Sequence, residues 1–187
     1  MTHLGTEALA RFMDEDFGRV LDLGSGAGDQ AKILRQKFKV DTISLFPPAD
    51  IIGDYLQTEL EPYDGIWCCH VLEHQPNVNF FLRKLYQDLT DDGVLAITVP
   101  PRKDQVVGGH LNLFNAGTLV YNLIMAGFNC SKARVAMYGY NVSVIVQKRP
   151  TGKVPLTMDS GDIERLAQFF PFPVEQGFDG LNARANW

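Results

Sequence analysis

Apolar residues fall along the chain in two patterns, short continuous runs and longer stretches with helical spacing. The short runs are rich in β-branched residues and stop at glycine, proline or acidic turns, which predicts buried strands. They cover residues 20–23, 40–46, 51–52, 65–69, 94–99, 134–138 and 142–147. Stretches with apolar residues three or four positions apart predict helices. These cover residues 4–13, 31–38, 78–89, 116–126 and 162–169.

The order of these elements predicts the fold class. Strands and helices alternate repeatedly, and such units build a parallel sheet that is covered on both faces. The last two strands are joined only by residues 139–141, so we expect them to pair antiparallel at that edge. The expected fold is α/β, with a single doubly wound, mostly parallel seven-stranded sheet, an antiparallel edge strand, and helices on both faces.

Chain length and composition indicate one domain with an appendage. A chain of 187 residues can bury one core and is too short for two ordinary domains. Residues 151–187 break the alternation with prolines, glycines and one short helical stretch. We therefore expect a domain over residues 1–150 and a C-terminal extension, residues 151–187, packed on it.

Charge and cysteine content narrow the partners and the compartment. The net charge of −5 disfavours non-specific binding to a phosphate backbone, so we expect no nucleic acid partner. The three cysteines, at positions 68, 69 and 130, lack framework spacing and indicate reduced thiols. The chain start lacks the segments of a signal peptide, and no apolar run approaches the roughly 20 residues that span a bilayer. We expect a cytoplasmic protein that binds no membrane.

The strongest local pattern is Val-Leu-Asp-Leu-Gly-Ser-Gly-Ala-Gly-Asp over residues 20–29. In it a predicted strand runs into Gly24, Gly26 and Gly28 directly before a helix. Small residues here let a ligand approach the backbone at a helix N-terminus. Taken alone, the loop is compatible with a dinucleotide, with S-adenosylmethionine, or with a tight turn that binds nothing.

Two carboxylates favour one of these ligands. Asp22 lies two residues before the first glycine, and Asp29 lies in the first turn of the helix. Asp29 would compete with a pyrophosphate for the same backbone N–H groups, and the third glycine follows the second by two residues rather than three. Carboxylates attract the sulfonium and ammonium groups of a cationic methyl donor. The alternative is a turn in which Asp29 only complements the helix dipole.

These residues resemble motif I of the class I, Rossmann-like S-adenosylmethionine-dependent methyltransferases, and the resemblance extends over about residues 17–148. Residues 53–55 resemble the family's segment whose acidic residue approaches the adenine amino group. Residues 63–74 resemble its fourth strand and the turn beside the methionine end, and residues 89–95 resemble the start of its fifth strand. The chain is most similar to the small-molecule "type 11/12"-like branch.

The resemblance implies a cofactor, S-adenosyl-L-methionine, with S-adenosyl-L-homocysteine as its product. It makes residues 1–150 the cofactor-binding methyltransferase domain. The cofactor-binding residues that it implies are Asp22, Gly24, Ser25, Gly26, Gly28, Ser44, Leu45, Asp54, Tyr55, Cys69 and His70.

One position departs from the family pattern. The family usually carries an acidic residue at the end of the second strand, where it accepts hydrogen bonds from the ribose hydroxyls, and this chain has Ser-Leu-Phe over residues 44–46. Ser44 offers one weaker hydrogen bond, while Leu45 or Phe46 can pack on the adenine. Loss of a charge-assisted hydrogen bond costs about 1.5–3 kcal/mol. Either the cofactor binds more weakly, or Asp50 replaces the missing acid.

Histidines supply the candidates for chemistry. His110 follows the fifth strand, in a run that resembles the family's "gHvr-x-fs" segment, and it is expected to act as a base or to orient the acceptor. The alternative is a loop-capping residue. His70 is expected to form the active-site wall and is the second catalytic candidate. With Glu73 and His74 it has a spacing that would allow a metal to bind, but turn residues are the simpler interpretation, and we expect no metal.

The predicted function is S-adenosylmethionine-dependent methyl transfer to an oxygen or nitrogen nucleophile, with a small molecule as the acceptor. A homodimer is compatible with this function. The alternative is a catalytically inactive protein that binds S-adenosylmethionine, such as the regulatory partner of a methyltransferase. The missing ribose-binding acid motivates this alternative.

Overall fold

The computed structural model describes residues 4–181 and 184–187 of the chain. Its strands form one eight-stranded sheet. They are β1 (Arg19–Leu23), β2 (Lys39–Ser44), β3 (Ile51–Ile52), β4 (Tyr63–Cys69), β5 (Leu89–Val99), β6 (Arg134–Tyr138), β7 (Asn141–Gln147) and β8 (Arg184–Ala185). The α-helices are α1 (Thr6–Met13), α2 (Asp29–Leu34), α3 (Val78–Gln87), α4 (Ala116–Met125) and α5 (Asp162–Leu166), with short 3₁₀ helices at Tyr55–Gln57, Leu72–His74 and Ala167–Phe169.

The strand order is β3-β2-β1-β4-β5-β7-β6-β8. The first five of these strands pair parallel, and β7 runs antiparallel between β5 and β6. The predicted fold class is confirmed. The sheet has one strand more than the seven predicted, because Ala185 and Arg184 pair with Val135 and Ala136 of β6. A two-residue strand is too short to show an apolar pattern in the sequence.

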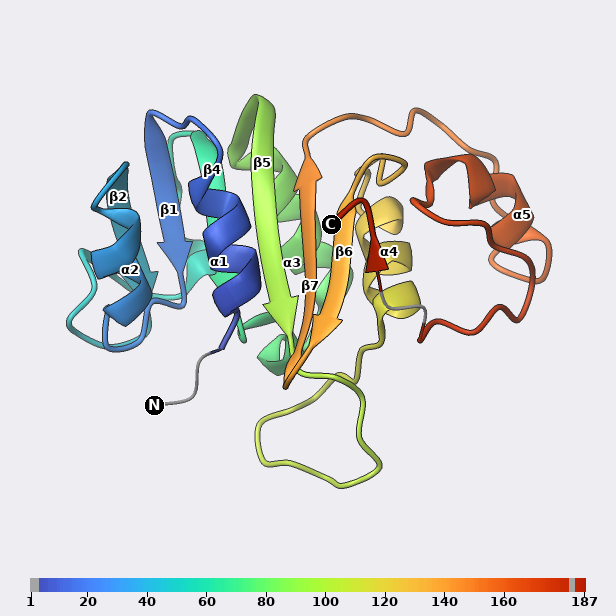
Figure 1. Ribbon diagram of the computed structural model, residues 1–187, viewed down its shortest axis with the longest axis horizontal. Coiled ribbons are helices and arrows are strands. Elements are labelled where there is room, and N and C mark those ends of the chain that lie inside the picture. Colours follow the sequence, from blue (N-terminus) through green and yellow to red (C-terminus); the bar gives the residue numbers. More distant parts are fainter. Residues whose placement is uncertain (1–3, 182–183) are drawn as a thin grey trace.

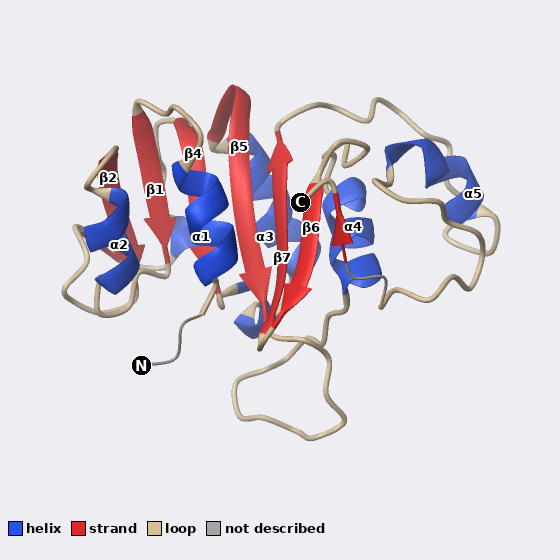
Figure 2. Ribbon diagram, viewed as in Figure 1, coloured by secondary structure: helices blue, strands red, loops and turns tan. Residues whose placement is uncertain are grey.

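Helices cover both faces of the sheet (Figures 1 and 2). Helices α1 and α2 lie on one face, and α3 and α4 lie on the other. Successive strand residues point to opposite faces, so Cys68 packs in the core beside α3 and α4, while Cys69 and Trp67 pack in the core beside α1. The two cysteines therefore face different cores, as their adjacency in a strand predicts.

Two element boundaries differ from the sequence prediction in ways that affect the site. Helix α2 begins at Asp29 directly after Gly28, whose φ of 78° makes a left-handed N-cap, and it ends at Leu34 rather than Phe38. Strand β2 ends at Ser44, so the two apolar residues that follow it, Leu45 and Phe46, lie exposed in a loop. Among the described helices, none is long and apolar enough to cross a bilayer.

The C-terminal segment contacts α4. The Gly117 amide donates to the Gly180 carbonyl at 2.8 Å. The Phe170 ring stacks on Tyr121 with centroids 6.4 Å apart and meets Phe178 edge-on at 5.7 Å. These contacts lie on the part of the sheet that holds β6 and β7, away from the glycine loop.

Candidate functional site

A pocket of about 440 Å³ opens where the carboxyl ends of β1, β2 and β4 meet. Strands β1 and β4 are neighbours, and the chain leaves them in opposite directions across the sheet. This is the topological switch point, at which open α/β sheets bind their ligands. The volume falls within the range typical of small-molecule sites.

The glycine loop follows β1, and its first glycine, Gly24, lines this pocket. Gly24, Gly26 and Gly28 all have positive φ, at 76°, 52° and 78°, which only glycine adopts without strain. The Gly24 amide donates to the Ile43 carbonyl at 2.8 Å, and the Gly28 amide donates to the Ser25 carbonyl at 2.8 Å. A Cβ on Gly28 would meet nothing within 4 Å, and one on Gly26 would meet only the Gly24 carbonyl at 4.0 Å. Gly26 and Gly28 thus present bare backbone to open space, whereas a Cβ on Gly24 would collide with Val71 Cγ2.

Asp22 lies below the loop and is 1% exposed. Its Oδ2 has no hydrogen-bond partner within the described part of the chain. Burial raises the pKa of the Asp22 carboxyl to about 7, and the charge of Arg35 and the Ala31 amide oppose this increase only in part. A buried carboxylate without full pairing attracts a cation.

The residues at the ends of β2 and β3 form one side of the pocket, which is mainly apolar. Leu45 and Phe46 are 61% and 72% exposed, and they line the pocket beside Ser44. The Asp54 carboxylate accepts hydrogen bonds from the Leu56 amide at 2.9 Å and from the Gln57 side chain at 3.2 Å. It is exposed and lines the same wall.

Tyr55 contributes its ring and not its hydroxyl to this wall. The hydroxyl donates to Asp88 Oδ2 at 2.8 Å, and burial together with this carboxylate raises the pKa of Tyr55. The ring packs edge-on against Phe81, with centroids 5.4 Å apart. The aromatic pair closes the pocket toward α3.

Asp50 is held away from the pocket. Its Oδ2 accepts hydrogen bonds from the Thr42 amide at 2.9 Å and the Thr42 hydroxyl at 2.8 Å, and it pairs with Arg35 at 2.6 Å. These bonds from Thr42, with the Arg35 charge, lower the pKa of the Asp50 carboxyl. In this arrangement Asp50 does not replace the missing ribose acid, and Ser44 remains as the hydroxyl at that position.

His70 follows β4 directly, with a φ of 56° that is unusual for a residue with a side chain. Its Nε2 lies 3.1 Å from Asn141 Oδ1. That oxygen also accepts from the Gly5 amide at 2.9 Å, and Asn141 Nδ2 donates to the Tyr138 carbonyl, so the amide orientation is fixed. His70 Nε2 therefore carries the proton. Its Nδ1 lies 3.3 Å from Glu73 Oε1, so both ring nitrogens face protein groups.

Glu73, His74 and His110 form a cluster beside the pocket. Glu73 is 1% exposed, and its Oε2 has no hydrogen-bond partner within residues 4–181 and 184–187. His74 lines the pocket, and its Nε2 lies 3.7 Å from Glu73 Oε1. The His110 ring meets the His74 ring edge-on, with centroids 5.2 Å apart. His110 reaches the pocket only through His74.

The structure brings about half of the residues expected at the cofactor site to the pocket wall. Those that line it are Gly24, Ser44, Leu45, Asp54, Tyr55 and His70. Those that do not are Asp22, Ser25, Gly26, Gly28 and Cys69. Burial raises the pKa of the Cys69 thiol to about 12, and its side chain packs beside α1, so it acts as a core residue.

Some wall residues escaped the sequence prediction. Val71 and Gln75 belong to the turn after β4, and Phe81 belongs to α3. The turn was predicted to line the site, so its first residue could have been included. Phe81 shows only the helical apolar spacing of a core residue, and that spacing does not reveal its contact with the pocket.

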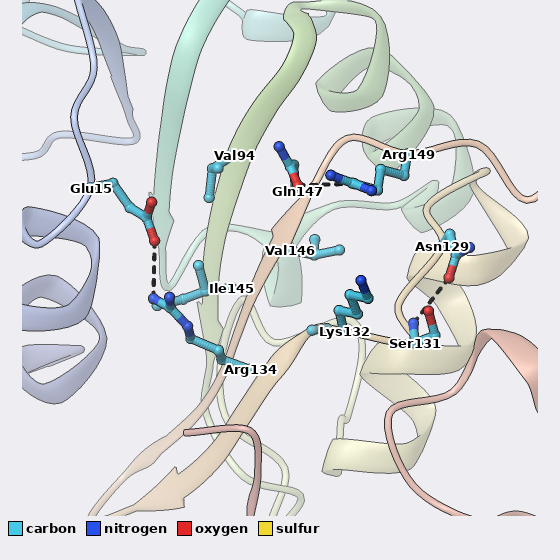
Figure 3. A pocket seen from close by; sticks show the side chains of 11 residues that line it. Glu15, Val94, Asn129, Ser131, Lys132, Arg134, Ile145, Val146, Gln147 and Arg149 are labelled. Atoms are coloured by element: carbon cyan, nitrogen blue, oxygen red, sulfur yellow. Dashed lines mark hydrogen bonds and ion pairs between the residues drawn. The ribbon is translucent and has the colours of Figure 1, made fainter.

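A second hollow, of about 320 Å³, lies at the other end of the strands (Figure 3). Its two arginines already have partners on the protein. Arg134 pairs with Glu15 at 3.0 Å, and Arg149 Nε donates to Gln147 at 2.9 Å. Because it lies where the parallel strands begin and its arginines are paired, we assign it no ligand.

Sequence comparison identifies the class that this fold and pocket define. The chain belongs to the methyltransferase domain family, whose profile matches residues 1–133. Its fold is that of the class I, Rossmann-like S-adenosylmethionine-dependent methyltransferases. Among curated protein sequences, none matches the chain.

Solved structures with this fold include enzymes of different activities. One is the 1,6-didemethyltoxoflavin-N1-methyltransferase of Burkholderia thailandensis, with bound 1,6-didemethyltoxoflavin and S-adenosylhomocysteine; its TM-score is 0.64, with 18% identity over 77% of this chain and 76% of that one. Another is a SAM-dependent methyltransferase of Archaeoglobus fulgidus, with a TM-score of 0.65 and 14% identity over 76% and 92% of the two chains. The [4+2]-cyclase SpnF has a TM-score of 0.56 and 19% identity over 66% and 56%.

Proposed function

We propose that this protein transfers a methyl group from S-adenosylmethionine to an oxygen or nitrogen atom of a small molecule. The observation that carries the proposal is the glycine loop that follows β1 at the switch point, where Gly24 lines the pocket and Gly26 and Gly28 present backbone to open space. The cofactor's methionine end would lie over this loop. Its adenine would lie between Leu45, Phe46 and Asp54. Membership of the methyltransferase domain family supports this reading.

A small acceptor suits the dimensions of the site. The pocket of about 440 Å³ must hold the cofactor and present its methyl group to the acceptor. The Burkholderia enzyme of the same fold binds 1,6-didemethyltoxoflavin and S-adenosylhomocysteine, which supports a small-molecule acceptor here.

Methyl transfer depends mainly on how the methyl donor and the acceptor are positioned. A sulfonium is a reactive electrophile, and holding the two reactants in line can contribute about 7–11 kcal/mol in favourable cases. A hydroxyl or a protonated amine must also lose a proton. His74 is the exposed histidine of the pocket wall, whereas both nitrogens of His70 already face protein groups. We therefore propose that His70 has a structural role in the pocket wall, and that His74 and His110 face the acceptor.

A protein that binds the cofactor without methyl transfer is the second candidate. It is favoured by the wall at the end of β2, where Ser44 stands in place of the ribose acid and Asp50 is bound to Thr42 and Arg35. The [4+2]-cyclase SpnF, which has this fold and a different activity, supports this second candidate.

Two measurements separate these candidates. Calorimetric titration with S-adenosylmethionine and S-adenosylhomocysteine should show binding of both. Mass spectrometry of reactions with a panel of small phenols, carboxylic acids and amines should then show S-adenosylhomocysteine and a methylated product in equal amounts. Binding without product across the panel would favour the second candidate, and no binding of either nucleoside at millimolar concentration would exclude both.

A further inference from the structure

The cluster of Glu73, His74 and His110 has the composition and spacing of a metal site. One carboxylate oxygen of Glu73 and one ring nitrogen of each histidine all lie within 4.8 Å of one another. The three residues come from two segments: Glu73 and His74 from the turn after β4, and His110 from the loop between β5 and α4. The sequence spacing pointed to His70 as the third member, but the folded chain brings His110 to this place.

The tautomer of His74 suits a metal ligand. Its Nδ1 lies 2.8 Å from the Gly109 carbonyl, which can only accept, so Nδ1 carries the proton. The Nε2 lone pair then points toward Glu73, 3.7 Å away. Metal-binding histidines commonly donate the second ring N–H to a carbonyl or carboxylate in this way, which fixes the ring and the tautomer.

Glu73 supplies a charge that the protein leaves incompletely paired. It is 1% exposed, and no described residue donates a hydrogen bond to its Oε2. A buried carboxylate is costly unless it is paired or bound to a metal. The cluster therefore joins an unpartnered buried oxygen with an oriented imidazole nitrogen.

The loop between β5 and α4 is tied to this same glutamate. The amides of Leu111 and Asn112 both donate to the Glu73 carbonyl, at 2.8 and 3.1 Å. These bonds hold the neighbouring His110 beside His74. The loop that contains it extends beyond the ends of the strands (Figure 1). Gly109, whose φ is 79°, precedes His110 and gives the backbone freedom to bring its ring closer.

We propose that Glu73, His74 and His110 bind a divalent transition metal ion, with zinc the best match. Two imidazoles and one carboxylate suit zinc, which bonds them at about 2.0–2.2 Å. Such bonds put the ligand atoms about 3.3 Å apart in a tetrahedral site. A small movement of the His110 loop closes the observed separation to that value. Three protein ligands leave a fourth position open, and His74 places it at the pocket wall.

The open position defines the acceptor class, an inference that rests on the proposed methyl transfer. A metal-bound hydroxyl has a lowered pKa and loses its proton to solvent. The oxygen's electron pair then forms the new C–O bond as the methyl carbon's bond to sulfur breaks. The released pair stays on sulfur, which becomes the neutral thioether of S-adenosylhomocysteine. The metal site therefore favours a hydroxyl-bearing acceptor over an amine.

The test is zinc binding by the full chain, freed of any affinity tag and of metal. Calorimetry with zinc chloride, in competition with a chelator of known affinity, should show one site per chain. His110→Ala and His74→Ala should each weaken zinc binding about 100-fold or more, since loss of an outer-shell partner alone costs roughly 10–100-fold. Leu111→Ala is the matched control, because it alters the same loop without removing a ligand atom, and it should bind zinc like the wild type.

Absence of zinc binding, or equal affinity in His110→Ala and the wild type, would overturn the proposal. His110 lies in a loop with exposed neighbours, so its variant is expected to fold, and circular dichroism verifies this. Titration with S-adenosylhomocysteine in the metal-free protein keeps the two proposals apart. If the nucleoside binds and zinc does not, only the metal site is wrong; if zinc binds and the nucleoside does not, the methyl transfer is wrong.

Discussion

At the scale of single residues, two carboxylates near the site are buried without a full set of hydrogen-bond partners. Asp22 and Glu73 are each 1% exposed, and each has one oxygen without a hydrogen-bond partner in the described structure. An unsatisfied buried polar group costs about 1–3 kcal/mol, and more when it is charged. Neither carboxylate lines the pocket, but each is next in sequence to a residue that does, Leu23 and His74, so a cationic cofactor and a metal ion bound there would each reduce that cost.

Asp22 makes the stability of the ligand-free protein depend on pH. Its pKa is raised by burial to about 7, whereas in the unfolded chain it is near 3.8. The contribution of the protonated group is therefore present below about pH 4 and is lost as the pH rises through 7, a change on the order of 4 kcal/mol. Asp22→Asn should unfold at a higher urea concentration than the wild type at pH 8 and should differ little from it at pH 4.

An equal stability difference at both pH values would show that the Asp22 carboxyl does not titrate in this range. The same variant also reports on function, because an amide cannot attract a cation as a carboxylate does. Its affinity for S-adenosylmethionine should be lower than that of the wild type at pH 8.

Asn141 holds His70 and the start of α1 together. Its Oδ1 accepts from the Gly5 amide and lies 3.1 Å from His70 Nε2. Asn141→Ala should lower the free energy of unfolding by about 1–3 kcal/mol, because it leaves two donors without an acceptor. Asn122→Ala removes an exposed hydrogen bond within α4 and should change it by less than about 0.5 kcal/mol. Urea unfolding measures both, and equal effects would contradict the role of Asn141.

At the scale of elements, the sequence predicts best where the chain has a strong period. The order of strands and helices, and the end of α4 before Gly127, whose φ is 112°, follow from local apolar spacing and glycine placement. Strand β8 does not, because Arg184 and Ala185 pair with residues nearly fifty positions earlier. The 3₁₀ turn at Leu72–His74 and the short α2 also depend on contacts that no local period encodes.

The contact between α4 and the C-terminal segment gives an element-scale test. In an unconstrained helix, Gly→Ala is stabilising by about 0.5–1 kcal/mol. A Cβ at Gly117 would lie 2.6 Å from Gly180 Cα, which is backbone and must shift. Gly117→Ala should therefore destabilise the protein, by about 1–3 kcal/mol, in thermal or urea unfolding.

Gly108→Ala is the control for this prediction, because a Cβ there would meet nothing within 4 Å. It should leave the free energy of unfolding nearly unchanged. A stabilising Gly117→Ala would mean that the segment around Gly180 does not rest on α4 in solution.

We propose that the loop between β5 and α4 acts in catalysis rather than in cofactor binding. His110 does not line the cofactor pocket but lies against His74. His110→Ala should lower the turnover number about 100-fold and leave the affinity for S-adenosylmethionine within a few-fold of the wild type. Steady-state kinetics with an acceptor from the panel, beside calorimetry, measures both quantities. Unchanged turnover would make His110 a structural residue of the loop.

At the scale of the whole molecule, the fold brings the candidate chemistry to one edge of the sheet. The glycine loop, the wall after β2 and the turn after β4 meet there because the parallel strands end together. Motif order in the sequence was enough to predict Gly24, Ser44, Asp54 and His70 at that edge. The meeting of His74 with His110 was not predictable, since it depends on the path of an aperiodic loop.

The central claim is that the glycine loop holds the cofactor, and paired calorimetric titrations with S-adenosylmethionine test it most directly. Gly26→Val and Gly152→Val both place a side chain at a positive-φ glycine, with φ of 52° and 71°, and neither Cβ meets an atom closer than 4.0 Å. The two variants carry comparable backbone strain, but only Gly26 lies in the loop. We predict one cofactor per chain for the wild type and Gly152→Val, and no measurable binding for Gly26→Val. Wild-type affinity in Gly26→Val would contradict the account.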